Sequence, residues 1–171
     1  MQMVKKSIGI LFALWFTLLL FMPKEEMYYT VEKRLAAQDI TLNEKSIDEG
    51  LFSFTLKDVT VYVKGIALAK IEKIDFFTLL AYNTLRLDNI VVDEVLHSKI
   101  PRKTEKAILT YQMFDPLNIS IDANGSFGYA KGSIYLVDKK LHVDFVKPKE
   151  IGIVKPLLKK GKKGWFYEKS F

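Results

Sequence analysis

Residues 51–76 read LFSFTLKDVTVYVKGIALAKIEKIDF, and this stretch decides the fold. Apolar and polar side chains alternate through it, and β-branched and aromatic residues dominate. Such alternation is typical of strands that bury one face, and Lys64-Gly65 is a turn signal between two of them. The stretch therefore predicts two long paired strands, with a break in the alternation near Lys57-Asp58.

The same pattern continues along most of the chain. Further alternating runs occur at 40–44, 85–95, 108–113, 119–121, 127–129 and 134–145. Their regular separation by turn signals predicts a mainly β fold of antiparallel, meandering strands. We expect these strands to form one exported sheet domain over residues 40–146. Phe77 to Tyr82 is apolar without alternation, and we expect a short helical crossing there, ended by Asn83.

One partial internal echo is present. The order apolar-x-apolar-x-Asp-x-apolar-x-apolar is found loosely around Leu56-Lys57-Asp58-Val59 and again around Leu87-Asp88-Asn89-Ile90. The likeness is too loose to indicate a repeat with a fixed period.

An uncharged apolar run, SIGILFALWFTLLLFMP, occupies residues 7–23 behind Lys5 and Lys6. A helix of this length spans about 25 Å, which is short for one membrane crossing but within the accepted range. We expect residues 1–23 to form a cytoplasmic stub and an uncleaved transmembrane anchor. Lysines precede the run and mixed charges follow it, so the positive-inside rule predicts a cytoplasmic N-terminus and an exported domain.

Two other interpretations of this run remain open. A cleaved secretory signal shares the basic start and the apolar stretch, but it needs small residues near its end. Here residues 20–23 are Leu-Phe-Met-Pro, which are bulky or rigid. A buried core helix is the second alternative, although a helix this apolar on all sides would be unusual at the start of so small a chain.

The residues behind this run, KEEMYYTVEKRLAAQ, predict a juxtamembrane helix within residues 24–39. Met27, Val31 and Leu35 are spaced to form one apolar stripe. Acidic residues in the first turn and basic residues towards the end suit the helix dipole. We expect this helix to continue the membrane helix or to bend from it at Pro23.

Composition narrows the class of protein. The chain has no cysteine, which excludes a disulfide framework and a thiol nucleophile. An exported domain without cystines favours a bacterial envelope protein. The net charge is +6, and it arises in residues 147–171, where eight lysines face Glu150 and Glu168. A nucleic-acid-binding protein needs a basic face on its folded domain, so we expect no nucleic-acid partner.

Residues 147–171 form a basic, aromatic C-terminal segment. Pro156 and Gly161 limit residues 153–163 to a short basic helix at best. Adjacent aromatic residues at 165–167 are expected to pair with a strand or pack into the domain. Lysines beside interfacial aromatics predict contact with lipid headgroups, whereas a solvated lysine run is the alternative. The candidate residues are Lys159, Lys160, Lys162, Lys163 and Trp165.

No pattern in the chain indicates catalysis, so we expect a protein that is not an enzyme and has no cofactor. His97 and His142 are far apart, and neither lies in a metal-binding motif. The alternation places His142 on a polar strand face together with Asp144. No nucleophile elbow or dinucleotide fingerprint is present.

Asn124 is a candidate for glycosylation. Asn124-Gly125-Ser126 matches the acceptor pattern, and the acidic residue two positions earlier fits the extended bacterial form. The alternative is an Asn-Gly hairpin turn without modification.

Residues 54–74 follow the pattern L-x-L-x-D-V-x-V-x-x-x-G-I-x-L-A-x-I-x-x-I, with Phe54 in place of the first Leu. Together with the anchor and short helix before it, this segment resembles the opening of AsmA-like bacterial envelope proteins. It is also similar to the type II secretion system protein N (GspN). Residues 118–145, with Gly-rich alternating strands, resemble the sheet that continues those folds. The lipopolysaccharide-export protein LptC, with one anchor and a β-jellyroll, is a second similar architecture.

The resemblance implies a single-pass protein of the bacterial inner membrane. Its periplasmic domain would be a folded-over antiparallel sheet, β-taco or jellyroll-like, whose apolar inner face binds or passes lipid. The lining residues would be Phe54, Leu56, Val59, Val61, Leu85, Leu87 and Ile121. The alternative is an accessory or scaffold subunit of a secretion or envelope assembly machine, which would bind partner proteins through exposed strand edges.

Overall fold

A computed structural model of the chain describes residues 2–79, 81–97, 100–161 and 164–171. Helices α1 (Gln2–Leu20) and α2 (Lys24–Ala36) precede one antiparallel sheet, which confirms the predicted mainly β fold. The strands are β1 (Ile40–Asn43), β2 (Ser46–Glu49), β3 (Ser53–Val63), β4 (Ile66–Thr78), β5 (Tyr82–Val92), β6 (Lys103–Gln112), β7 (Asp115–Gly125), β8 (Gly128–Tyr135), β9 (Lys140–Pro148), β10 (Lys159–Gly161) and β11 (Gly164–Ser170). Two short 3₁₀ helices are η1 (Glu94–Leu96) and η2 (Lys155–Leu157).

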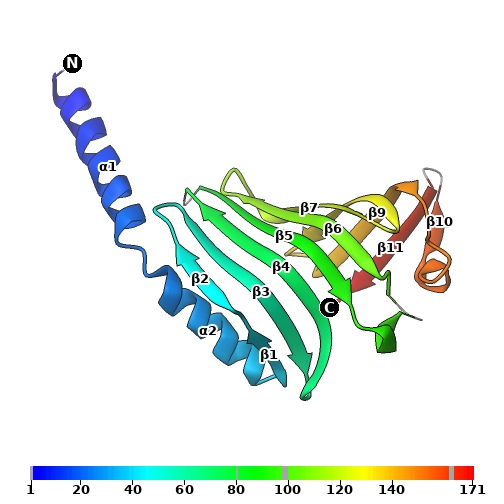
Figure 1. The fold of residues 1–171 in the computed structure, drawn as a ribbon. Helices are drawn as coiled ribbons and strands as arrows, with labels where there is room; N and C mark the ends of the chain where they lie inside the picture. The colour runs from blue at the N-terminus through cyan, green and yellow to red at the C-terminus, as the bar shows by residue number, and fades with distance from the viewer. Residues whose placement is uncertain (1, 80, 98–99, 162–163) are drawn as a thin grey trace.

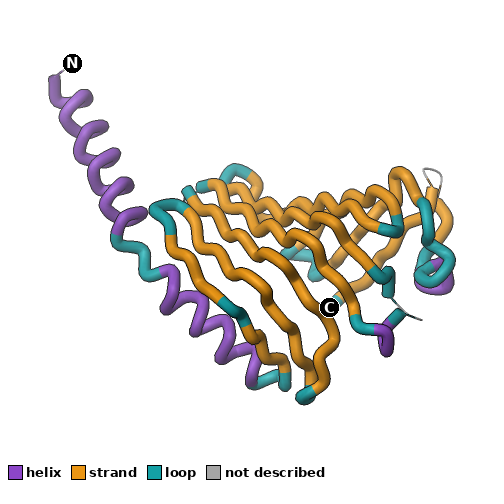
Figure 2. Tube along the Cα trace, viewed as in Figure 1, coloured by secondary structure: helices purple, strands orange, loops and turns teal. Residues whose placement is uncertain are grey.

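The sheet is a meander from β3 to β9, in which each strand pairs with the next in sequence. At one end β1 and β2 pair with successive parts of β3, and at the other end β9 pairs with β11, which pairs with β10. Figure 1 shows that the sheet is curved. Figure 2 shows that both long helices lie at its N-terminal end. One end of the sheet therefore has a helical cover, and the other does not.

Residues 3–20 of α1 form a helix long and apolar enough to cross a membrane. By length and composition the helix suits an anchor or a signal sequence, and it projects away from the sheet in Figure 1. Leu19, near its end, is buried. Pro23 precedes α2, so the chain bends at Pro23, one of the two predicted outcomes.

A line of irregular residues crosses the sheet at Asp58 and Asn89. Both residues have left-handed backbone angles, with φ of 50° and 51°. They flank Glu72 of β4, whose carboxylate accepts a hydrogen bond of 2.6 Å from the Asn89 side chain. Asp and Asn adopt this conformation more readily than other residues with a Cβ. The predicted break near Lys57-Asp58 is confirmed, and the loose sequence echo marks the same bend in β3 and in β5.

The bend changes the phase of the alternation. Leu56 and Val59 belong to one core cluster although they are three residues apart in one strand, and Leu87 and Ile90 both pack against it. Without the left-handed residues Asp58 and Asn89, the second half of β3 and of β5 would present its apolar side chains to the other face.

Three local predictions are wrong. The described residues between 77 and 82 form no helical crossing, because β4 continues to Thr78 and β5 begins at Tyr82. Apolar Phe76 and Phe77 belong to opposite faces of β4, which hid the alternation. The described part of the predicted basic helix, residues 153–161, forms the 3₁₀ helix η2 and strand β10 instead, since Pro156 interrupts regular hydrogen bonding.

The third wrong prediction is a turn at Asn124-Gly125. Both residues lie within β7, and the hairpin tip is Ser126-Phe127. The C-terminal aromatics do pair with strands, as predicted, through β11. The sheet therefore extends past residue 146, and the expected domain boundary falls inside β9.

A candidate apolar binding groove

The strand register sorts the side chains onto two faces. Opposite residues in a pleated sheet point the same way, so each row of paired residues from β3 to β11 belongs to one face. Two adjacent rows are almost entirely apolar and define what we call the inner face. The first row is Leu56, Ile74, Leu87, Ala107, Ala123, Ala130, Phe145 and Trp165, and the second is Phe54, Phe76, Leu85, Leu109, Ile121, Gly132, Val143 and Tyr167.

The other face, here the outer face, is polar over the same strands. One of its rows is Thr55, Asp75, Arg86, Ile108, Asp122, Lys131, Asp144 and Phe166. Its charged groups pair with one another across strands, as in the contact of 3.7 Å between Lys131 and Asp122. The sheet thus has one face suited to water and one suited to hydrocarbon.

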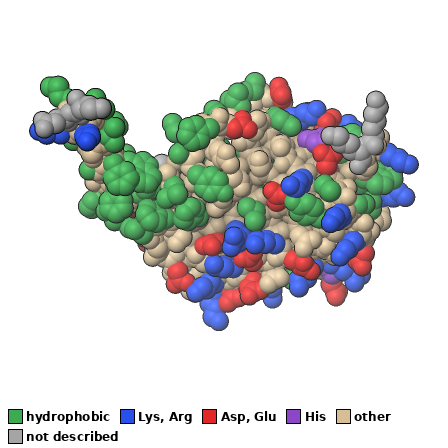
Figure 3. Space-filling model, turned by 90° about the horizontal axis from the view of Figure 1, so that it is seen from above, with side chains coloured by type: hydrophobic (Ala, Val, Ile, Leu, Met, Phe, Trp, Pro, Cys, Tyr) green, Lys and Arg blue, Asp and Glu red, His purple; other side chains and the backbone are tan. Residues whose placement is uncertain are grey.

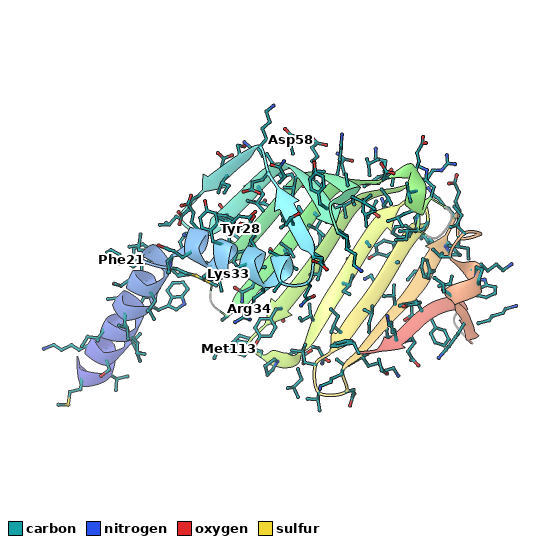
Figure 4. The ribbon with its side chains drawn as sticks, turned by 90° about the horizontal axis from the view of Figure 1, so that it is seen from below. Phe21, Tyr28, Lys33, Arg34, Asp58 and Met113 are labelled. Atoms are coloured by element: carbon teal, nitrogen blue, oxygen red, sulfur yellow. The ribbon has the colours of Figure 1, made fainter. Side chains whose placement is uncertain are left out.

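Helix α2 lies across the inner face at its N-terminal end (Figure 4). Tyr28 is buried with its ring 5.4 Å from that of Phe54, and both belong to the core cluster with Leu56, Val59 and Ile71. The Tyr28 hydroxyl donates a hydrogen bond of 2.7 Å to the Glu44 carboxylate. This polar tip fixes the rotation of α2 over the sheet.

The burial of Tyr28 also changes the pKa of its hydroxyl group. Burial, followed by the hydrogen bond to the Glu44 carboxylate, raises the pKa of Tyr28 well above its ordinary value. The phenol therefore remains a protonated donor at any ordinary pH.

Lys24 begins α2 and is also buried, at 5% exposed. Its ammonium group lies 3.3 Å from the Glu49 carboxylate at the end of β2. A buried ammonium needs such a partner, because desolvation of an unpaired charge is costly. The pair joins the start of α2 to the sheet beside the groove described next.

A groove of about 400 Å³ separates α2 from the sheet, a size typical of small-molecule sites. Its lining is Met22, Lys24, Met27, Tyr28, Val31, Leu42, Phe54, Leu56, Ile74, Phe76, Leu85 and Leu87. Met27 and Val31, from the predicted stripe of α2, are 46% and 53% exposed although they line it. The stripe therefore borders an unfilled space rather than a packed core.

The predicted lining residues fall into three groups. Phe54, Leu56, Leu85 and Leu87 line the groove. Val59 belongs to the buried cluster under α2, and Val61 packs against that cluster. Ile121 lies on the inner face in β7, outside the groove.

Sequence reasoning did not assign the α2 side of the groove. The sequence pattern predicted no role for Lys24 or Tyr28 in a binding site. The apolar stripe at Met27 and Val31 was the available signal, since an apolar stripe on a short helix must face something apolar.

Beyond the groove, the inner face continues without a helix over it (Figure 4). Leu109, Ile121, Val143 and Phe145 are only partly buried there. Phe127 folds back from its hairpin tip and packs edge-on against Phe145, with ring centroids 6.0 Å apart. An apolar strip therefore runs from the covered groove towards β11.

The outer face carries ionisable side chains of the kinds that catalysis uses, but these side chains form ion pairs. His142 lies 3.3 Å from both Glu168 and Asp144, and its register places it on the polar face as predicted. The Lys140 ammonium, 2.8 Å from Glu168, holds the pKa of that carboxyl below its ordinary range. In the part of the chain that the structure describes, no group of His, Asp and Glu side chains is arranged to hold a metal.

Asn124 is exposed on the outer face, and its side-chain amide donates a hydrogen bond of 3.0 Å to Glu105. The glycosylation prediction therefore concerns a strand residue next to a hairpin tip. Nothing in this position tests whether the amide is modified.

The predicted headgroup residues lie near the far end of the sheet from α1 (Figure 1). Lys159 is 3.6 Å from Glu168 in an ion pair, and Lys155 lies over the Trp165 ring at 5.3 Å. Lys160 is exposed beside Trp165. Lys162 and Lys163 lie outside the described residues. This cluster does not adjoin α1.

Comparison of the chain with family models, with characterised proteins and with solved structures finds no significant match. The resemblance to AsmA-like proteins, to protein N and to LptC therefore rests on the sequence pattern alone. Function must be argued from the groove and the inner face.

Proposed function

We propose that this protein is a membrane-anchored lipid-binding domain of the bacterial cell envelope. In this proposal α1 crosses the inner membrane with its N-terminus in the cytoplasm, and the sheet lies in the periplasm as a folded-over trough. The inner face receives the hydrocarbon chain of a lipid. It binds or passes that lipid without chemistry.

One observation carries the proposal, namely the apolar inner face that continues from under α2 to β11. Proteins in water seldom leave such a connected apolar surface open unless it has an occupant. The groove supplies apolar contact on two sides through Met27 and Val31 of α2 and Phe76 of the sheet. A flexible acyl chain suits a long, shallow apolar strip better than a compact polar metabolite does.

The strand edges favour this function over the scaffold alternative. β1 and β2 have four residues each, and β10 has three. Short edge strands and edge lysines, such as Lys159 and Lys160 in β10, are common protections against pairing with another chain. An assembly partner that adds a strand would find little backbone to pair with at either end.

The test uses a photoreactive residue on each face of β7. The full chain is expressed with p-benzoylphenylalanine in place of Ile121, which points to the inner face, or Ser120, which points to the outer face. Membranes that contain the protein are irradiated, the protein is purified, and its mass is measured by mass spectrometry. We expect a lipid adduct at position 121 and none at position 120.

Two results would overturn the proposal. An unmodified protein at both positions would show that lipid does not occupy the inner face. Equal labelling at both positions would indicate unspecific contact with membrane lipid or detergent.

A further inference from the structure

The hairpin tips at one end of the strands carry many exposed apolar side chains together with a few charged ones, Asp115, Asp138 and Lys139. The described residues of these tips are 50–52, 79, 81–82, 113–117 and 135–139, joined by the C-terminal Phe171, and we call this border the anchor-side rim. Exposed apolar side chains on it are Leu51, Tyr82, Met113, Phe114, Leu117, Tyr135, Leu136, Val137 and Phe171. Phe114 is 93% exposed, an unusual state for a phenylalanine in water.

Backbone hydrogen bonds hold neighbouring tips side by side. The Thr78 amide donates to Phe52, and the Met113 amide donates to Ala81, each at 2.8 Å. The amides of Leu136 and Phe171 donate at 2.9 Å to Leu117 and Lys139, respectively. These contacts make the rim one connected surface.

The membrane helix leaves the domain at this same rim. Phe21 and Met22 connect α1 to α2. Lys24, the first residue of α2, pairs with Glu49. Glu49 lies opposite Phe54, which is near the start of β3 at the rim. From there α2 runs to the other end of the strands, where β1 starts opposite Val63. Figure 4 shows Phe21 and Met113 towards the side on which α1 departs, with Asp58 on the opposite side.

The aromatic residues distinguish the two ends of the strands. Among the described residues of the sheet, the exposed aromatic side chains are Tyr82, Phe114, Tyr135 and Phe171, and all lie on the anchor-side rim. Exposed aliphatic residues such as Ile66 and Val95 also occur at the opposite end. There they are interspersed with Lys64, Arg102 and Lys103.

Figure 3 views the molecule from the anchor side. Hydrophobic side chains cover α1 and are scattered over the adjoining part of the domain, while charged side chains concentrate along one border. Aromatic residues next to a membrane span are typical of the interface between hydrocarbon and headgroups.

From these observations we infer that the anchor-side rim inserts into the surface of the bilayer that α1 spans. The inference rests on the membrane anchoring proposed above and adds the orientation of the domain. α1 and the rim are two attachments on one side of the domain, and together they fix its orientation relative to the bilayer. Asp115 and Asp138 on the same tips lie among the headgroups, and the basic C-terminal cluster faces away from this membrane.

This orientation gives the groove an entrance. Met22, at the membrane end of α2, is part of the groove lining. With the rim in the headgroup region, a lipid chain reaches the inner face directly from the bilayer, without passing through water.

The absence of cysteine allows a direct test by site-specific labels. The full chain is reconstituted in phosphatidylcholine vesicles with a nitroxide on a single introduced cysteine. Collision rates are measured with oxygen, which concentrates in hydrocarbon, and with a water-soluble nickel chelate. Val137→Cys probes the rim, and Val95→Cys is a matched control, because the two valines are 69% and 70% exposed. Leu14→Cys probes α1.

We expect labels at positions 14 and 137 to collide more often with oxygen than with nickel, and the label at position 95 to show the reverse. Phe114→Cys should behave as Val137→Cys does, which guards against a local effect of one substitution. The zwitterionic lipid is chosen because the rim is apolar, so insertion should not require anionic headgroups.

Two other outcomes have separate meanings. A label at position 14 in hydrocarbon, with positions 114 and 137 in water, would overturn rim insertion and leave the anchor intact. A label at position 14 in water would overturn the anchor itself, and with it both proposals.

Discussion

The two ends of the sheet share one pattern but differ in cover. From β1 to β5 the inner face lies against α2, and Phe54, Leu56 and Val59 are buried at 6%, 4% and 0% exposed. From β6 to β11 the same face has no helix over it, and its larger apolar side chains, Leu109, Ile121, Val143 and Phe145, are only partly buried. Alternation therefore builds the sheet at both ends, whereas a packed core forms only where a helix closes it.

The covered end and the open end contribute differently to the stability of the domain. A fully buried large apolar side chain contributes roughly 1.5–3 kcal/mol, and a half-buried one contributes correspondingly less. The covered end therefore stabilises the domain. The open end depends on strand pairing, and its inner face remains available to an occupant.

The largest expected effect compares one phenylalanine from each end. Phe54→Ala removes a buried ring that packs on Tyr28, and we expect it to lower the free energy of unfolding by about 3–5 kcal/mol. Phe145→Ala removes a partly exposed ring from the open end, and we expect about 1–2 kcal/mol. Urea unfolding of the detergent-solubilised full chain, followed by circular dichroism, measures both.

Equal losses for these two variants would break the comparison, because they would show that the open end is packed as tightly as the covered one.

The next effect concerns the ion pair that holds the start of α2. Breaking a fully buried pair costs roughly 3–5 kcal/mol. We expect about 2 kcal/mol for Glu49→Ala, since Lys24 is buried but the Glu49 side chain is 42% exposed. The neighbouring Asp48→Ala is the control. It removes an exposed pair with Lys57, so its effect on the same unfolding curve should be much smaller. Indistinguishable curves for the two variants would mean that Lys24 finds water or another partner.

The smallest effect depends on pH. Tyr28→Phe removes the hydrogen bond to Glu44 and should cost about 1 kcal/mol at neutral pH. In the native chain, burial and that hydrogen bond raise the pKa of Tyr28, so the folded state keeps a proton that the unfolded state loses above about pH 10. The stability from this tyrosine is thus complete below pH 10 and declines as the pH rises further.

The measurement compares unfolding of the native chain and Tyr28→Phe between neutral pH and about pH 11, on either side of the ordinary tyrosine pKa. The advantage of the native chain should shrink above about pH 10. Parallel curves would indicate that the hydroxyl reaches solvent.

Sequence alone predicted the parts of the fold that depend on local pattern. The period-two alternation predicted the strands. The break at Asp58 was visible because the apolar residues Leu56 and Val59 are three positions apart, whereas strict alternation places apolar residues two positions apart. The crossing at 77–82 was misjudged because Phe76 and Phe77 are apolar on both faces. Four of the predicted lining residues, Phe54, Leu56, Leu85 and Leu87, do lie in the groove.

The rest required the tertiary arrangement. Lys24 is a charged residue that only a distant carboxylate, Glu49, allows to be buried. Phe114, Phe171 and the end of α1 meet at the anchor-side rim because the antiparallel strands return to the same end of the sheet. These residues are far apart in the chain, so no single stretch of sequence predicts that they are neighbours.

The meander has a consequence for how such a domain changes size. Each added hairpin starts and ends at the same end of the strands, so the chain returns to where it left. An insertion of two strands would widen the inner face by about 10 Å while every tip kept its side and the N-terminal helices kept their place. The fold can therefore be widened in evolution one hairpin at a time without a new architecture.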